Sequence, residues 1–276
     1  MNNPFPQLFY GTAWKEERTE TLVDQAIRLG VRAIDSANQR RHYFEAATGR
    51  AVANHIQQGT VLRSELFLQS KFTYQQGQDH RLPYNPQASL ADQVRQSFAS
   101  SLEHFQTDYL DSLLLHGPLY RQGISAQDWQ VWTALGELQS RGQVRHVGLS
   151  NVSAGQLQEW IEKTDVPITF VQNRCFAALG WDREVRQLCR QNGILYQGFS
   201  LLTANIREIE SPRMLLLAER YKTDLASLVF AFAHAVGMIV LTGTTQADHL
   251  MADLKALNLV LSAEDVKSIE TIAFSR

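Results

Sequence analysis

Short apolar runs recur along the whole chain and alternate with stretches that carry apolar residues at helical spacing. The strand-like runs cover residues 8–12, 31–37, 66–72, 111–117, 146–151, 168–173, 194–200 and 238–244. Between them, positions such as Leu90, Val94 and Phe98 follow the i, i+4 spacing of amphipathic helices. Eight successive β–α units predict an α/β fold, a (β/α)8 TIM barrel formed by a single domain over residues 1–276. A doubly wound open sheet is the alternative, because periodicity alone does not show whether a sheet closes.

Composition and charge narrow the classes of function. The chain has 26 Lys plus Arg against 28 Asp plus Glu, so its charge favours neither nucleic acid nor an acidic membrane surface. Its N-terminus lacks the pattern of a signal peptide, and its longest apolar stretch, residues 228–241, is too short to span a bilayer. Cys175 and Cys189 form neither a metal-ligand pattern nor a disulfide framework. We therefore expect a cytoplasmic protein that binds no nucleic acid, membrane or metal; the sequence does not indicate its oligomeric state.

Two longer stretches interrupt the alternation of strands and helices. Residues 74–88 follow the third strand-like run and residues 201–224 follow the seventh, so both lie on the side of a barrel where ligands bind. Loops of this length are either lids and specificity loops or surface insertions without function. Near the C-terminus, Ser262 and Asp265 have the spacing of a helix N-cap.

Four residues with acid–base chemistry lie at or just past the ends of three successive strand-like runs: Asp35, Tyr43, Lys71 and His116. Each of them alone could be a cap, a packed side chain or a solvated strand end. In a parallel barrel, however, the C-terminal ends of the strands meet at one mouth, where catalytic residues gather. A carboxylate, a phenol, an ammonium and an imidazole together can protonate an oxyanion without a metal ion. The convergence predicts an enzyme.

Seven motifs in order resemble the aldo-keto reductase family. They are AIDSA (33–37), LFLQSK (66–71), YLDSLLLHGP (109–118), GQVRHVGLSN (142–151), FVQN (170–173), GFS (198–200) and LTGT (241–244). The resemblance implies an NAD(P)H-dependent oxidoreductase that reduces an aldehyde or ketone to an alcohol, with a small-molecule carbonyl substrate. It implies that Tyr43 is the general acid and that the Lys71 ammonium lowers the pKa of its phenol. Asp35 would hold Lys71 by an ion pair, and His116 would orient the carbonyl.

The same resemblance implies a site for NADP(H), since no side chain can supply a hydride. Residues expected to contact the nicotinamide are Ser150, Asn151, Gln172, Phe199 and Ser200. Residues expected near the ribose and pyrophosphate are Gly11, Thr12 and Ala13, and those expected at the adenosine phosphate end are Gly243, Thr244, Thr245, His249 and Asp253.

Two departures from the family pattern affect these assignments. The family places its tyrosine five residues after the aspartate, where this chain has Arg40, so we assign the acid to Tyr43 and keep His42 as the alternative. NADP-preferring members place a lysine or arginine at the adenosine end, but residues 243–254 contain neither, and His249 replaces the arginine. NADP(H) remains the expected cofactor, with NAD(H) as the alternative.

Two other functions remain open from the sequence. A Schiff-base aldolase would use Lys71 as its nucleophile and needs a lowered lysine pKa, whereas an ion pair with Asp35 would raise that pKa. A regulatory subunit that binds a nicotinamide nucleotide without turnover is compatible with the lengthened loop before Tyr43. The substrate is not indicated, although five aromatic residues near strand ends suggest an apolar lining: Trp14, Phe72, Tyr74, Tyr84 and Phe176.

Overall fold

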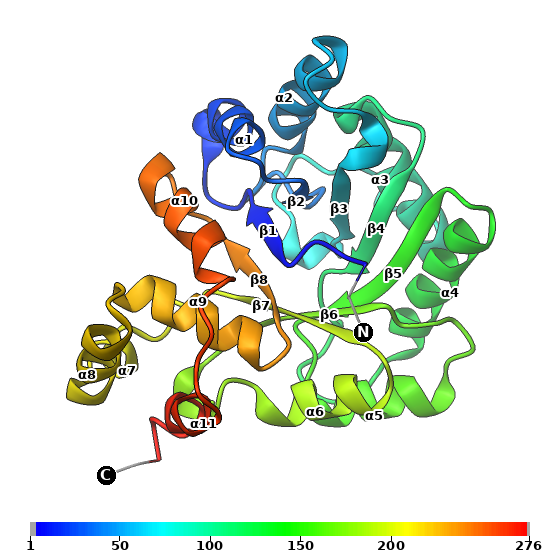
Figure 1. Cartoon of the computed structure of the whole chain (residues 1–276). Helices are drawn as coiled ribbons and strands as arrows, with labels where there is room; N and C mark the ends of the chain where they lie inside the picture. The colour runs from blue at the N-terminus through cyan, green and yellow to red at the C-terminus, as the bar shows by residue number, and fades with distance from the viewer. Residues whose placement is uncertain (1–3, 275–276) are drawn as a thin grey trace.

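Eight parallel strands close into one barrel in chain order, surrounded by helices (Figure 1). The computed structural model describes residues 4–274; residues 1–3 and 275–276, the ends of the predicted domain, lie outside the described residues. The strands are β1 (Leu8–Gly11), β2 (Ala33–Asp35), β3 (Phe67–Phe72), β4 (Leu110–Leu115), β5 (Val144–Ser150), β6 (Phe170–Arg174), β7 (Leu195–Phe199) and β8 (Ile239–Thr242). Pairing of β1 with β8, in which Leu8 lies opposite Val240, closes the ring. The predicted (β/α)8 barrel is confirmed and the open sheet is wrong.

Eleven α-helices and four 3-10 helices are described in residues 4–274. The α-helices are α1 (Thr19–Arg28), α2 (Glu45–Gln57), α3 (Leu90–Phe105), α4 (Ala126–Ser140), α5 (Ala154–Lys163), α6 (Arg183–Gln191), α7 (Ile206–Ile209), α8 (Pro212–Tyr221), α9 (Leu225–Ala235), α10 (Ala247–Ala256) and α11 (Ala263–Glu270). The 3-10 helices are η1 (Glu16–Arg18), η2 (Arg63–Glu65), η3 (Gln75–Gly77) and η4 (Ala177–Leu179). The predicted cap is present, because the Ser262 hydroxyl accepts a hydrogen bond from the Asp265 amide at the start of α11.

Apolar side chains fill the end of the barrel where the strands begin. Phe9, Phe67 and Phe170 belong to a cluster inside the ring, since alternate side chains of a strand point to the same face. Phe5 precedes β1 on a segment that crosses this end of the barrel, and its ring packs edge-on against Phe67 and Phe170 at centroid distances of 6.0 and 5.2 Å (Figure 1). This end is therefore closed by packing, and chemistry is confined to the other end.

The main core lies between the strands and the helices around them. Trp132 of α4 and Trp160 of α5 are fully buried there, with ring centroids 6.2 Å apart. Within residues 4–274, no helix combines the length and the apolar character needed to cross a membrane.

Candidate active site

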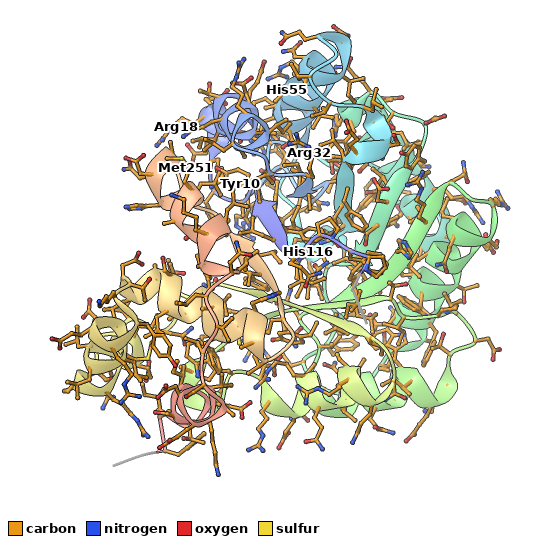
Figure 2. All side chains as sticks on the ribbon, in the orientation of Figure 1. Tyr10, Arg18, Arg32, His55, His116 and Met251 are labelled. Carbon is orange, nitrogen blue, oxygen red and sulfur yellow. The ribbon has the colours of Figure 1, made fainter. Side chains whose placement is uncertain are left out.

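Strand alternation brings three of the predicted catalytic residues to the open mouth of the barrel. Asp35 ends β2, Lys71 lies two residues beyond the inward-facing Gln69 in β3, and His116 follows β4 directly. Because side chains repeat every second residue, each points toward the barrel axis above an inward-facing neighbour. Figure 2 places His116 near the centre of the ring of strands.

Asp35 and Lys71 form a buried ion pair. The Lys71 Nζ lies 2.6 Å from Asp35 Oδ1 and 2.7 Å from Oδ2, and donates a third hydrogen bond to the Ser36 carbonyl at 2.7 Å. All three N–H groups of the ammonium are therefore used. Burial lowers the pKa of Lys71, and the Asp35 carboxylate acts in the opposite direction. The predicted pairing is present in the structure.

Three glutamines support the Asp35 carboxylate from below. The Nε2 atoms of Gln69 and Gln172 donate to Asp35 Oδ1 at 2.7 and 2.9 Å, and both also donate to Gln197 Oε1. Gln197 returns a hydrogen bond to Gln69 Oε1 at 3.1 Å. This layer satisfies polar atoms that would otherwise be costly to bury, and it fixes the carboxylate in one position.

Tyr43 faces the same cavity from the loop between β2 and α2. The Lys71 Nζ lies 5.2 Å from the centre of its ring, and the rings of Tyr43 and His116 meet edge-on at 5.9 Å. Within residues 4–274, the Tyr43 hydroxyl makes no hydrogen bond to another residue, so it is available to a ligand. His42, the alternative acid, does not line the cavity; its ring packs on Trp14 at 4.0 Å.

The predicted lowering of the Tyr43 pKa is wrong for this structure. Burial raises the pKa of the phenol well above its usual value, and the charge of Asp35 raises it further. The ammonium of Lys71 lies over the ring face and is paired with Asp35, and these two effects outweigh its charge. Tyr43 is consequently a protonated phenol at neutral pH.

His116 is held by a threonine that the sequence interpretation missed. Its Nδ1 lies 2.7 Å from the Thr73 Oγ1. Burial, followed by the charges of Lys71 and His42, lowers the pKa of His116 to about 3, so the imidazole is neutral at physiological pH. When Thr73 donates to Nδ1, the single ring proton resides on Nε2. In that tautomer Nε2–H is a hydrogen-bond donor, and Thr73 does not occupy it.

A cavity of about 800 Å³ extends from these residues toward α9 and α10. Predicted site residues that line it are Gly11, Ala13, Asp35, Tyr43, His116, Ser150, Asn151, Gln172, Phe199, Ser200, Gly243, Thr244, His249 and Asp253. Three predicted residues do not line it. Lys71 is buried behind Asp35, Thr12 is buried with its hydroxyl donating to the Asp35 carbonyl at 3.0 Å, and Thr245 is exposed.

The cavity suits a dinucleotide in its volume and in its polar groups. Asn151 Nδ2 donates to the His116 carbonyl and to Ser150 Oγ, which leaves Asn151 Oδ1 as an acceptor for an amide. Both N–H groups of Gln172 are used internally, so its oxygen is what remains for a ligand. Asn151 and Ser200 have φ values of 56° and 57°, a left-handed conformation that recurs at ligand sites.

Ten further lining residues were not predicted individually, although four of them belong to the stretch 201–224. They are Leu201, Leu202, Thr203, Asp224, Leu225, Ala226, Phe230, Leu241, Thr242 and Ala252. Residues 201–203 directly follow the GFS motif, which was the available signal, and Asp224 caps α9. The long stretch 201–224 thus contributes to the cavity at both of its ends, whereas residues 74–88 contribute no lining residue. None of the five aromatic residues expected around the substrate lines this cavity, so the apolar lining of the substrate pocket stays a prediction.

The far end of the cavity is acidic rather than basic. Burial raises the pKa of Asp253 to about 6, although the Thr242 hydroxyl donates to its carboxylate at 2.6 Å and opposes the shift. Among residues 4–274, no lysine or arginine lines the cavity, and His249 is the basic residue at this end. A cofactor with several phosphates therefore needs positive charge from outside the lining.

Sequence comparisons agree with this geometry. The profile of the Aldo/keto reductase family matches residues 7–211. The methylglyoxal reductase DkgB of Escherichia coli O157:H7 is 26% identical over 259 residues, which cover 94% of this chain and 89% of the relative. An aldo-keto reductase of Mycobacterium avium (strain 104) is 28% identical over 267 residues, 96% of this chain and 85% of the relative.

Solved structures share the fold. An aldo-keto reductase of Bombyx mori, determined in complex with NADP, superposes with a TM-score of 0.83 at 20% identity and covers 99% of this chain and 91% of its own. An aldo/keto reductase of Brucella melitensis gives a TM-score of 0.81 at 22% identity, with 98% of this chain and 94% of its own covered.

Proposed function

Because the chain belongs to the aldo/keto reductase family, it is an NAD(P)H-dependent oxidoreductase of aldehyde and ketone carbonyls, and we propose that Tyr43 supplies the proton in this reaction. The observation that carries the proposal is the position of the free Tyr43 hydroxyl in one cavity with Asp35 and His116. When bound, NADP(H) supplies the hydride, and the chain's own residues position the carbonyl and deliver the proton.

Tyr43 acts as an acid because it is protonated and faces the ligand cavity. Its raised pKa keeps the proton on the phenol until negative charge develops on the carbonyl oxygen. The Lys71 ammonium, 5.2 Å from the ring centre, then stabilises the charge that the departing proton leaves on Tyr43. Asp35 keeps the ammonium charged and in place.

His116 is a second donor to the carbonyl oxygen. As a neutral ring with its proton on Nε2, it donates a hydrogen bond without changing its own charge. Two donors, Tyr43 from the loop after β2 and His116 directly after β4, define where the oxygen lies, and both strengthen their hydrogen bonds as negative charge develops.

Residues along the cavity hold the cofactor. Asn151 and Gln172 offer amide oxygens to the nicotinamide carboxamide, and Phe199 offers an aromatic ring to the flat nicotinamide. His249 and Asp253 lie at the adenosine end, where an acidic side chain is suited to a ribose hydroxyl.

The geometry disfavours the aldolase. A Schiff base needs the lone pair of an amine, whereas the Lys71 ammonium donates three hydrogen bonds and lies 1% exposed. The complete constellation around Tyr43 likewise gives no reason to assign a purely regulatory role. A cytoplasmic location and the absence of nucleic-acid and membrane partners stay predictions from the sequence.

Cofactor binding followed by a carbonyl panel tests the function. The protein is titrated with NADPH and with NADH by fluorescence quenching, and then assayed for NADPH consumption with a series of aldehydes and ketones. We expect NADPH binding and turnover of at least one carbonyl class. Tight NADPH binding without turnover of any carbonyl would contradict the enzyme and support a regulatory protein.

A further inference from the structure

A buried lysine approaches the cavity from the loop that follows β1. Lys15 is only 6% exposed, and its Nζ donates a hydrogen bond to the Gly243 carbonyl at 2.6 Å. The same nitrogen lies 5.1 Å from the centre of the Tyr10 ring, and the Tyr10 hydroxyl donates to the Thr244 carbonyl. Tyr10 is part of β1 and is labelled in Figure 2. The carbonyls of Gly243 and Thr244, which follow β8, thus accept hydrogen bonds from side chains in and just after β1.

Within residues 4–274, no carboxylate lies within ion-pair distance of Lys15. Burial, followed by the charge of Arg18, lowers the pKa of Lys15 to about 8, so the amine remains an ammonium at neutral pH. The Gly243 carbonyl occupies one of three N–H donors. A buried ammonium without an anion is costly to maintain, which points to a ligand that supplies the negative charge.

The loop holds Lys15 inward by two unusual backbone conformations. Its neighbours Trp14 and Glu16 have φ values of 60° and 49°, the left-handed region that side chains other than glycine and asparagine seldom adopt. The Trp14 amide also donates to the His42 carbonyl at 2.7 Å, which fastens this loop to the one that carries Tyr43. Conformations of this kind collect at functional sites.

Lys15 also lies beside position 243, where a Cβ would make an ordinary contact with it. A Cβ added to Gly243 would lie 3.7 Å from Lys15 Nζ. Position 243 begins the segment 243–254, where NADP-preferring members of the family carry a lysine or arginine and this chain has neither. The ammonium of Lys15 is therefore beside the main chain of that segment, although it comes from another part of the sequence.

We propose that Lys15 binds a phosphate group of the cofactor's adenosine half and replaces the cation that residues 243–254 lack. The proposal rests on the function proposed above, because it requires a nicotinamide dinucleotide in the cavity. A lysine stem is flexible, and the ammonium can direct its two remaining donors to phosphate oxygens. Such charge-assisted hydrogen bonds are stronger than the one it makes to a carbonyl.

The test compares cofactor affinity in charge variants by fluorescence titration with NADPH and with NADH. Lys15→Gln removes the charge but keeps a donor for the Gly243 carbonyl, and Lys15→Met removes both. Lys163→Met, at an exposed lysine of α5 on another side of the barrel, is the matched control. We expect both Lys15 variants to lose NADPH affinity by about tenfold or more, and Lys163→Met to stay within about twofold of wild type.

The two cofactors identify which phosphate is bound. Loss for NADPH alone assigns Lys15 to the 2′-phosphate, whereas loss for both cofactors assigns it to the pyrophosphate; either result supports the proposal. Wild-type affinity of Lys15→Gln for both cofactors would overturn it and leave the proposed function intact. A wild-type protein that binds neither nucleotide would overturn both.

A second-site variant separates loss of charge from damage to the loop. Gly243→Lys in the Lys15→Met background restores a cation beside the same main chain, and position 243 has room for a Cβ. We expect the double variant to recover most of the lost NADPH affinity. No recovery, with thermal unfolding of Lys15→Met below that of Lys163→Met, would show that Lys15 acts only through the structure of its loop.

Discussion

At the scale of single residues, one carboxylate organises the site. Asp35 Oδ1 accepts from Lys71, Gln69 and Gln172, and these donors offset the cost of burying it. The carboxylate therefore keeps the ammonium under Tyr43 without taking part in proton transfer itself. Its position depends on residues from two other strands, β3 and β6, so the site is as rigid as the barrel that carries it.

Thr73 gives a test of how His116 is oriented. Thr73→Val removes the hydroxyl that contacts Nδ1 and keeps the volume of the side chain. The ring can then carry its proton on either nitrogen, so we expect kcat/KM to fall by about fivefold, equivalent to about 1 kcal/mol. Thr73→Ser retains the hydroxyl and should restore activity. Equal kcat/KM in the valine variant and wild type would show that Thr73 does not select the tautomer.

The pH profile tests the charge state of His116. Its pKa of about 3 lies below the usual 6.5, so lowering the pH protonates the ring only near pH 3. We expect no histidine inflection from His116 in kcat/KM between about pH 5 and pH 8. An inflection near pH 6.5 that disappears in His116→Gln would contradict a neutral imidazole.

Residue positions and residue chemistry differed in how far they could be predicted. Asp35, Lys71 and His116 were predictable because strand ends and a period of two place them. The direction in which the pKa of Tyr43 shifts was not predictable, because it depends on where the Lys71 ammonium points and on how far Asp35 neutralises its charge. Lys15 was missed because its contact with Gly243 joins residues far apart in the sequence.

At the scale of elements, α2 positions the loop that carries Tyr43. This helix crosses α3 so closely that a Cβ on Gly49 would lie 1.7 Å from the His104 carbonyl oxygen. Glu45 at the start of α2 also hydrogen-bonds His104 at 2.9 Å. The lengthened loop from Ser36 to Phe44 is thus fixed at its far end by helix packing.

Gly49→Ala tests this crossing. The added methyl must push the two helices apart, so we expect a loss of about 3 kcal/mol or more in the free energy of unfolding, measured with urea. Gly155→Ala in α5 is the control, because a Cβ there meets nothing within 4 Å, and we expect it to change stability by no more than about 1 kcal/mol. Equal stability of the two variants would rule out the tight crossing.

Elements with a regular pattern were predictable, and α8 was not. All eight strands overlap the apolar runs that predicted them, with ends that differ by a few residues. Residues 201–224 were interpreted as a loop, yet they contain α7 and α8. Leu215 and Leu216 of α8 are exposed at 53% and 65% while Leu217 is buried, so the apolar residues do not keep to one face and the helical period is obscured.

At the scale of the whole molecule, closure of the barrel creates the site. The eight β–α units predicted a closed barrel, but periodicity alone left an open sheet as the alternative. The β1–β8 pairing, which joins residues more than 200 positions apart, decides between them. That pairing brings the loop of Lys15 beside Gly243 and completes the cavity between the catalytic residues and α10. Neither contact follows from local sequence, since both depend on the closed ring.

The most direct measurement is the turnover of Tyr43→Phe with NADPH bound. Removal of the hydroxyl should lower kcat by at least about a hundredfold, the usual contribution of a general acid, with NADPH affinity within about twofold of wild type. His42→Gln, at the other candidate acid, should keep wild-type turnover within a few-fold. Wild-type turnover in Tyr43→Phe, or a comparable loss in His42→Gln alone, would contradict the assignment of proton transfer to Tyr43.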